Sequence, residues 1–163
     1  MNDHGRNSFD GSGSAIQSYV HYSTNYSNAF WDGSRMTYGD GDGVNYGPLV
    51  SLDIVGHELA HGVTEFSANL IYQRESGALN ESFSDIFGEA VENFATGSNN
   101  WQMGTEIGIG GSGAFRSMNN PNAFSDPDTY GGDFWRNPDC GTPTRANDYC
   151  GVHSNSGVQN KWF

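Results

Sequence analysis

The most informative stretches of the sequence are Val55-Gly-His-Glu-Leu-Ala-His-Gly62 and Leu79-Asn-Glu-Ser-Phe-Ser-Asp85. His57 and His61 are four positions apart, so on a helix both imidazoles lie on one face and can close on one metal ion. Glu58 lies roughly 100° around the helix axis, beside such an ion and not on it. A catalytic zinc takes three protein ligands and keeps one position open. We therefore predict a catalytic zinc site with Glu81 as the third ligand.

Both stretches are predicted to be helices because apolar residues recur at helical spacing. The first helix is expected to begin at Ser51, whose hydroxyl can cap free amides, with Asp53 in its first turn. The second is expected to end at Gly97. Its apolar positions are Phe83, Ile86, Phe87, Ala90, Val91 and Phe94, and its acidic positions on another face are Glu81, Asp85, Glu89 and Glu92. Taken alone, Glu89 is typical of a solvated helix surface.

Further motifs follow in order along nearly the whole chain. They include Asn28-Ala-Phe-Trp31, Tyr38-Gly-Asp-Gly-Asp-Gly43, Leu70-Ile-Tyr-Gln73, Phe115-Arg-Ser-Met118 and Gly151-Val-His-Ser-Asn-Ser-Gly157. Together with the two helical stretches, they resemble the thermolysin family of neutral zinc endopeptidases. The spacing from His61 to Glu81 is 20 positions (81 − 61). Related zinc aminopeptidases typically set the third ligand one position nearer, so the spacing favours an endopeptidase.

The resemblance implies an α+β fold, a thermolysin-like zinc-peptidase core in which a β-segment precedes two site-bearing helices. Residues 1–50 are expected to form the end of an N-terminal β-rich lobe with a substrate-binding edge strand, and residues 51–97 the zinc-site helices. Residues 98–163 are expected to form a loop-rich segment and the start of an incomplete C-terminal helical lobe, with Ser156 as a helix cap. Family members have longer lobes at both ends. We therefore expect a central fragment, truncated at both ends, of a secreted precursor that also carries a propeptide.

Composition excludes some partners. The chain of 163 residues has 7 basic and 19 acidic residues, a net charge of −12, and no basic cluster. Nucleic acid and anionic membranes are disfavoured as partners because both are bound through basic surfaces. No apolar run approaches the roughly 18 residues that span a bilayer, and we expect no signal peptide in the stretch after Met1. The expected partners are protein or peptide substrates.

The resemblance also implies catalytic roles. Glu58 is expected to act as general base and then general acid. Tyr72 and His153 match the residues that donate hydrogen bonds to the oxyanion formed during peptide hydrolysis, and Asp148 matches the residue that orients His153. By residue type alone Tyr72 is an ordinary core or surface tyrosine, and the matching context is what favours a catalytic role. Asp85 is expected to accept the free N–H of a ligand histidine, with His57 as the first choice.

Substrate-binding residues are likewise implied by the resemblance. Asn28 and the backbone of Ala29 match groups that hold a peptide main chain along an edge strand. Arg116 matches the residue that clamps a substrate carbonyl, although a lone arginine is usually a solvated charge. The family's apolar side-chain pocket corresponds to Tyr46, Leu49, Ile54, Met103 and Phe115. These positions predict a preference for bulky hydrophobic residues after the scissile bond.

A structural calcium ion is also predicted. Asp53, Glu89 and Glu92 match carboxylates that hold calcium behind the zinc-site helices, and carboxylate oxygens suit this cation. The paired calcium site of thermolysin needs further acids where this chain has Asn100, Gln102 and Thr105. We therefore expect a single site in which Asn100 donates a neutral oxygen.

Cys140 and Cys150 are the only cysteines and are ten positions apart in a loop-rich stretch. They are expected to form a disulfide if the protein is exported, and two free thiols are the alternative. The resemblance to secreted enzymes favours the disulfide. Metal binding by these thiols is disfavoured because no further cysteine or histidine completes a ligand set.

Two other functions remain open at this stage. The chain could be a catalytically inert or binding-only fragment that keeps every motif but lacks the lobes that complete the cleft. The chain could also be a zinc aminopeptidase, which requires a group that captures the free amine of the substrate. No motif for such a group is visible in the sequence.

Overall fold

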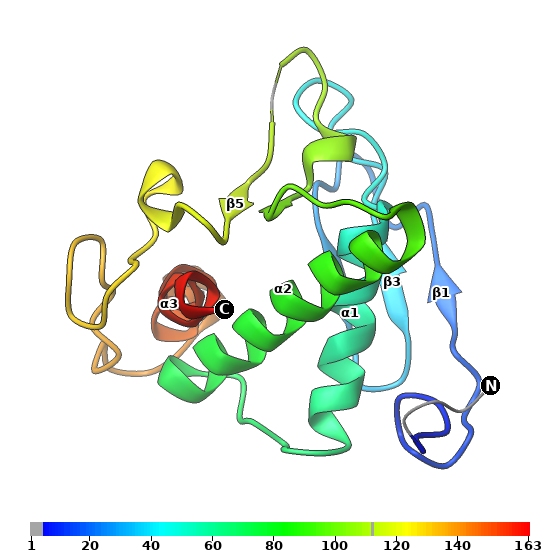
Figure 1. Cartoon of the computed structure of the whole chain (residues 1–163), viewed down its shortest axis with the longest axis horizontal. Helices are drawn as coiled ribbons and strands as arrows, with labels where there is room; N and C mark the ends of the chain where they lie inside the picture. The colour runs from blue at the N-terminus through cyan, green and yellow to red at the C-terminus, as the bar shows by residue number, and fades with distance from the viewer. Residues whose placement is uncertain (1–4, 112) are drawn as a thin grey trace.

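A computed structural model of the chain describes residues 5–111 and 113–163 and has the predicted α+β architecture (Figure 1). The first half contains β1 (Ser18–Tyr19), β2 (Ala29–Trp31), β3 (Met36–Tyr38), α1 (Leu52–Glu65) and α2 (Arg74–Thr96). The second half contains β4 (Gln102–Met103), η1 (Thr105–Ile107), β5 (Arg116–Ser117), η2 (Pro121–Phe124), η3 (Arg145–Asn147) and α3 (Asp148–Trp162). The long helix α2 lies between α3 on one side and α1 on the other.

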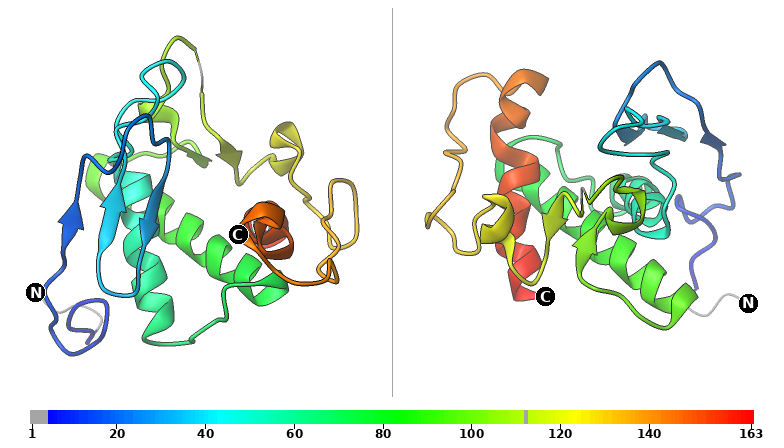
Figure 2. Two further views of the ribbon diagram at one scale, coloured as in Figure 1. Left: turned by 180° about the vertical axis from the view of Figure 1, so that it is seen from behind. Right: turned by 90° about the horizontal axis from the view of Figure 1, so that it is seen from above.

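The strands before α1 form a sheet in the order β1-β3-β2, in which β1 is parallel to β3 and β2 antiparallel to it. β2 is an edge strand because it comes last in this order, and its Trp31 pairs with Met36 and its Ala29 with Tyr38 of β3. One face of the sheet packs on α1, as the view from behind shows (Figure 2). The buried core between them contains Ala29, Met36, Tyr38, Leu49, Ile54 and Ile107.

Two glycines allow α1 and α2 to cross at close range. A Cβ on Gly56 would lie 3.0 Å from the Cα of Gly88, and a Cβ on Gly88 would lie 2.4 Å from the carbonyl oxygen of Asp53. Any larger residue at position 88 would force the helix axes apart. This close crossing brings the two predicted metal-binding stretches face to face.

The helix α2 buries its polar face. Glu81, Asp85 and Glu89 are fully buried, whereas Phe87 is 49% exposed and Phe94 93% exposed. The expectation that Glu89 lies on a solvated surface is therefore wrong, because the acidic face of α2 packs against α1 and α3. None of the helices in the described ranges combines the length and apolar character that crossing a membrane requires.

The sequence predicted only some of the helix ends correctly. Gly97 ends α2 with a left-handed φ of 81°, as predicted. Ser51 is at the N-cap of α1, but its side chain makes no capping hydrogen bond. The prediction for Ser156 is wrong, because this residue lies inside α3 and its hydroxyl donates to the His153 carbonyl at 2.6 Å. The right-handed part of α3 begins several residues earlier, after a left-handed turn.

Candidate active site

His57, His61 and Glu81 converge at the crossing of α1 and α2. The Nε2 atoms of the two histidines are 3.0 Å apart. Glu81 Oε1 lies 3.4 Å from His61 Nε2, and Glu81 Oε2 lies 3.5 Å from His57 Nε2. Glu81 Oε2 is buried and has no hydrogen-bond partner among the described residues. Two imidazoles, one carboxylate and an unsatisfied buried oxygen fit a zinc ion.

The second nitrogen of each histidine also has a polar neighbour. His61 Nδ1 lies 2.7 Å from Asn80 Oδ1. Because an amide oxygen only accepts, His61 donates from Nδ1 and its Nε2 keeps a free lone pair. His57 Nδ1 lies 2.9 Å from Asp85 Oδ1. Both rings are therefore oriented with Nε2 toward the predicted metal position.

Asp85 is the centre of a buried polar network. Arg116 donates to it from Nε at 3.0 Å and from Nη2 at 2.6 Å. The Asn160 side chain on α3 donates to Asp85 Oδ2 at 2.8 Å and accepts from the Ser82 hydroxyl at 2.7 Å. Burial raises the pKa of Asp85, but Arg116 and His57 outweigh it and hold the pKa well below its usual range. The carboxylate is therefore charged and fixed in place.

Glu58 follows the first ligand histidine and lines the same cavity. Its side chain is buried, and burial is the largest cause that raises the pKa of its carboxyl to about 7. Glu81 raises this pKa further, and His61 opposes the shift. Glu58 does not belong to the ligand group, in agreement with its position on the helix.

Another part of the cavity wall is formed by Tyr72, His153 and Asp148. The Tyr72 hydroxyl donates to Glu81 Oε1 and lies 3.1 Å from His153 Nε2. Asp148 accepts a hydrogen bond from the His153 amide at 3.0 Å, and its other oxygen contacts His153 Nδ1. His153 Nε2 is 3.4 Å from Glu81 Oε1. Two residues far apart in the sequence therefore lie beside the ligand cluster, Tyr72 with its O–H group and His153 with its ring N–H group.

A cavity of about 920 Å³ joins these groups. Its walls include Asn28 just before the edge strand β2, Ala29 at the start of β2, and Arg116. The predicted apolar pocket residues also line it, namely Tyr46, Leu49, Ile54, Met103 and Phe115. The cavity is therefore large enough to admit a peptide segment, and the predicted substrate residues surround one space.

Comparison with known proteins agrees with this geometry. Residues 1–65 match the family described as thermolysin metallopeptidase, catalytic domain, and residues 68–163 match its alpha-helical domain. The chain belongs to the thermolysin family. It is 53% identical over 163 residues to bacillolysin of Brevibacillus brevis and 49% identical over 164 residues to thermolysin of Alicyclobacillus acidocaldarius. Each match covers 98% of this chain but 28% of the relative.

A solved structure has the same fold. The precursor of protealysin, a metalloproteinase from Serratia proteamaculans, superposes with a TM-score of 0.79 at 36% sequence identity. The match covers 97% of this chain and 51% of that chain. This thermolysin-family chain thus spans about a quarter to a half of the length of these relatives.

Three predicted calcium ligands of this thermolysin-family chain lie on the zinc-site helices, Asp53 on α1 and Glu89 and Glu92 on α2. Glu89 Oε1 and Glu92 Oε2 are buried without hydrogen-bond partners among the described residues. Burial, followed by the charges of Glu92 and Asp53, raises the pKa of Glu89 to about 7. Asp53 accepts from the Ile54 and Gly104 amides, and Asn100 Oδ1 accepts from the Gln102 amide.

These carboxylates are less compact than the zinc group. Within residues 5–111 and 113–163, His57, His61 and Glu81 form the one group of three His, Cys, Asp or Glu side chains whose ligand atoms all lie within 4.8 Å. Asp53, Glu89 and Glu92 do not form a second such group. The arrangement leaves two acids with unmatched oxygens, which a cation could neutralise.

The structure joins Cys140 and Cys150 by a disulfide. The bond links the segment before η3 to Cys150, three positions before His153. Sequence reasoning gave no role to Asn80 or Asn160, which contact His61 and Asp85. Asn80 was open to prediction because it precedes Glu81 on the same helix. Asn160 was not, because it is 75 positions from Asp85 and gives no local signal.

Proposed function

We propose that this chain carries the catalytic centre of a zinc endopeptidase that hydrolyses internal peptide bonds. One observation carries the proposal: His57, His61 and Glu81 have ligand atoms within 4.8 Å of one another, with Glu58 beside them in one cavity. Bound there, zinc would lower the pKa of a water molecule from about 15.7 toward about 7 and would polarise the peptide carbonyl.

The side chain of Glu58 moves the proton. It is buried in the cavity wall, adjacent in sequence to a ligand but outside the ligand group. It accepts a proton from the attacking water and passes it to the leaving amine, acting as general base and then as general acid. Removing its carboxylate should spare metal binding and abolish turnover.

Tyr72 and His153 stabilise the negative charge that develops on the substrate oxygen. Their polar atoms lie 3.1 Å apart and both reach Glu81, so they flank the reacting carbonyl. Asp148 holds the His153 ring by its contact with Nδ1, which leaves Nε2 directed into the cavity. One preorganised donor to an oxyanion contributes about 2.7–4 kcal/mol in comparable enzymes.

The substrate class follows from the cavity walls. Met103, Leu49 and Ile54 are nearly fully buried and apolar, so they favour a bulky hydrophobic side chain after the scissile bond. The free edge of β2 offers backbone groups for an extended peptide, and Asn28 lines the cavity beside it. Arg116 is expected to contact a substrate carbonyl from its position on the wall.

Internally quenched peptides with both termini blocked test the endopeptidase proposal. A panel that varies only the residue after the scissile bond should be cleaved fastest with leucine, isoleucine or phenylalanine. Cleavage only of peptides with a free amino terminus would favour an aminopeptidase. Fastest cleavage next to charged residues would contradict the predicted pocket.

A catalytically inert or binding-only fragment is the second candidate. The observation that favours it is the apolar face of α2, where Phe83, Phe87 and Phe94 are exposed. Zinc bound in a one-to-one ratio without turnover by this chain, together with turnover by a longer protein that contains it, would support this candidate.

A single calcium ion held by Asp53, Glu89, Glu92 and Asn100 is the proposed structural metal. The unmatched buried oxygens of Glu89 and Glu92 support it. Calcium added to the chelated protein should raise the melting temperature, and no shift at millimolar calcium would count against the site. Glu92→Gln should reduce the shift, with the exposed Glu75→Gln as a control.

Secretion and a propeptide are part of the same proposal. The Cys140–Cys150 disulfide supports an oxidising compartment. The similar structure from Serratia proteamaculans is that of a precursor, which supports processing from a longer chain. Immunoblots of the culture medium and of the cells test both expectations. The medium should contain the mature protein, and the cells should contain a longer precursor.

A further inference from the structure

The loop closed by Cys140 and Cys150 (the disulfide loop, residues 140–150) ends in a left-handed turn. Four consecutive residues have positive φ angles: 54° at Asp148, 48° at Tyr149, 69° at Cys150 and 88° at Gly151. Glycine adopts this conformation freely and aspartate tolerates it, but a Cβ makes it unfavourable for Tyr149 and Cys150. Such a turn persists only where surrounding contacts hold it.

The turn places two side chains on the catalytic wall. It folds Asp148 back so that its carboxylate accepts the His153 amide at 3.0 Å and contacts the ring at Nδ1. It also packs Tyr149 edge-on against Tyr72, with ring centroids 5.5 Å apart. The two proposed donors to the oxyanion are therefore both positioned by residues of this turn.

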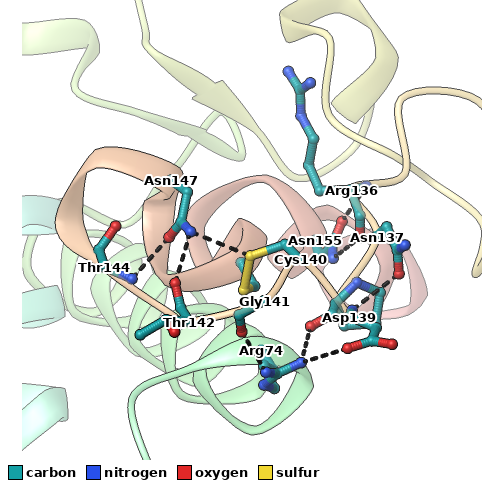
Figure 3. Close-up of a disulfide and its surroundings, with 12 residues drawn as sticks. Arg74, Arg136, Asn137, Asp139, Cys140, Gly141, Thr142, Thr144, Asn147 and Asn155 are labelled. Carbon is teal, nitrogen blue, oxygen red and sulfur yellow. Dashed lines mark hydrogen bonds and ion pairs between the residues drawn. A yellow bond between two sulfur atoms is a disulfide. The ribbon is translucent and has the colours of Figure 1, made fainter.

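The disulfide is the covalent contact that holds the turn (Figure 3). Cys150 is buried, whereas the rest of the disulfide loop is largely exposed. Inside the loop, the Asn147 side chain donates to the Thr142 carbonyl at 3.0 Å and accepts from the Thr144 amide at 2.8 Å. The Tyr149 amide donates to the Thr144 carbonyl at 2.8 Å. Water competes for the donors and acceptors of these exposed hydrogen bonds, but it does not weaken the covalent disulfide.

The disulfide loop is anchored to two other parts of the chain. From α2, Arg74 donates to the Gly141 carbonyl at 2.7 Å and also to the Pro138 carbonyl (Figure 3). Within the loop, Arg145 donates to the Tyr26 hydroxyl at 3.2 Å, and both residues line the cavity. The loop therefore fixes the turn relative to α2 and to the segment before β2.

We propose that the Cys140–Cys150 disulfide is a positioning element of the active site, which holds Asp148 on His153 and Tyr149 on Tyr72. Without the bridge, the backbone at Tyr149 and Cys150 relaxes toward right-handed conformations. The Asp148 carboxylate then moves away from the His153 imidazole. The donors to the oxyanion then lose their orientation while the zinc ligands keep theirs. The consequence is a lower kcat with unchanged KM and zinc content. This inference rests on the proposed peptidase function.

Two cysteine-free variants separate positioning from general stabilisation. The variant C140A/C150A keeps a Cβ at the left-handed position 150, whereas C140A/C150G removes it and can hold the turn without a bridge. Each is compared with the wild-type protein for kcat and KM on a quenched peptide, zinc content, melting temperature and hydrogen exchange of the His153 amide. That amide donates to Asp148, so its exchange reports the turn independently of turnover.

The alanine variant should lose between about 10-fold and 100-fold in kcat, the range expected for a misplaced catalytic group. Its His153 amide should exchange faster. The glycine variant should recover most of the kcat and of the amide protection, although its melting temperature stays below that of the wild type. Wild-type kcat in both variants would overturn the proposal, and so would an equal loss in both.

Reduction of the wild-type protein provides a second measurement if the alanine variant does not fold. A water-soluble phosphine converts the disulfide into two thiols and becomes a phosphine oxide that takes its oxygen from water. The reduced wild type should lose His153 amide protection, and the glycine variant should not respond to the phosphine. Unchanged exchange after reduction would overturn the proposal. Absence of turnover in the wild type would refute the peptidase function, and amide exchange would still decide the role of the disulfide.

Discussion

Arg116 and Asp85 form a two-pronged ion pair, with Nε and Nη2 of the arginine 3.0 and 2.6 Å from the two carboxylate oxygens. The same carboxylate lies 2.9 Å from Nδ1 of His57. A residue of the cavity wall and a predicted zinc ligand thus share one buried anion. Changes at Arg116 are therefore expected to affect metal binding as well as substrate binding.

Replacement of Arg116 by methionine should leave Asp85 as a buried charge without its main partner. The free energy of unfolding should fall by about 3–5 kcal/mol, the usual cost of breaking a buried ion pair from one side. Urea unfolding measures this loss. The double variant R116M/D85N removes both charges and should recover most of it. A loss below about 1 kcal/mol in R116M would mean that the pair contributes little.

Replacement of Asn80 by alanine should weaken zinc binding. Asn80 accepts the Nδ1 proton of His61, and loss of such a partner typically costs 10–100-fold in metal affinity. Competition with a chromophoric chelator measures the affinity. The exposed Asn93→Ala on the same helix is the matched control. Equal affinities for the two variants would show that His61 needs no such partner.

The sequence predicted what local spacing determines. His57 and His61 share a helix face by their separation of four, and Gly97 ends the second helix because it tolerates a left-handed φ. Periodicity also separated the apolar and acidic faces of α2. It could not tell which face is buried, because burial depends on where α1 and α3 pack.

Other parts of the site depend on tertiary contacts. The pairing of Arg116 with Asp85 and of Asn160 with Asp85 joins residues 31 and 75 positions apart. Motif matching indicated that Arg116 faces substrate but did not predict its ion pair. The left-handed turn at Tyr149 and Cys150 was also hidden, because neither residue type signals a positive φ.

The helix crossing gives a prediction about position 88. A glycine-to-alanine change inside a helix normally stabilises by up to about 1 kcal/mol. Gly88→Ala should instead destabilise by about 1–3 kcal/mol, because the new Cβ would lie 2.4 Å from the Asp53 carbonyl oxygen. Thermal and urea unfolding measure the sign of the change in the free energy of unfolding. A more stable variant would contradict the close crossing of α1 and α2.

Asp126 gives a prediction about pH. Burial raises its pKa from 3.8 to about 6, with Arg116 opposing the shift, Asp85 and Asp148 adding to it, and the Ser154 side chain lowering it. Between these pH values the folded protein keeps a proton that the unfolded chain releases. The contribution of Asp126 to the free energy of unfolding is therefore largest below the unfolded pKa, and it is lost as the pH rises through the folded pKa.

Asp126→Asn removes this titration. The variant should gain stability relative to the wild type as the pH rises from about 4 to about 7, and the difference should then stay constant. Urea unfolding of both proteins across this range tests the sign. A difference that is independent of pH would show that Asp126 titrates normally in the folded protein.

Zinc content and peptide hydrolysis, measured together on the wild type, Glu58→Gln and Glu81→Gln, test whether His57, His61 and Glu81 hold a catalytic zinc while Glu58 moves the proton. Glu58→Gln should keep one zinc per chain and lose about 10²–10⁴-fold in kcat, because it removes the proton carrier and no ligand. Glu81→Gln should lose zinc and turnover together. Loss of zinc in Glu58→Gln, or full zinc binding in Glu81→Gln, would contradict the assignment of His57, His61 and Glu81 as the ligands.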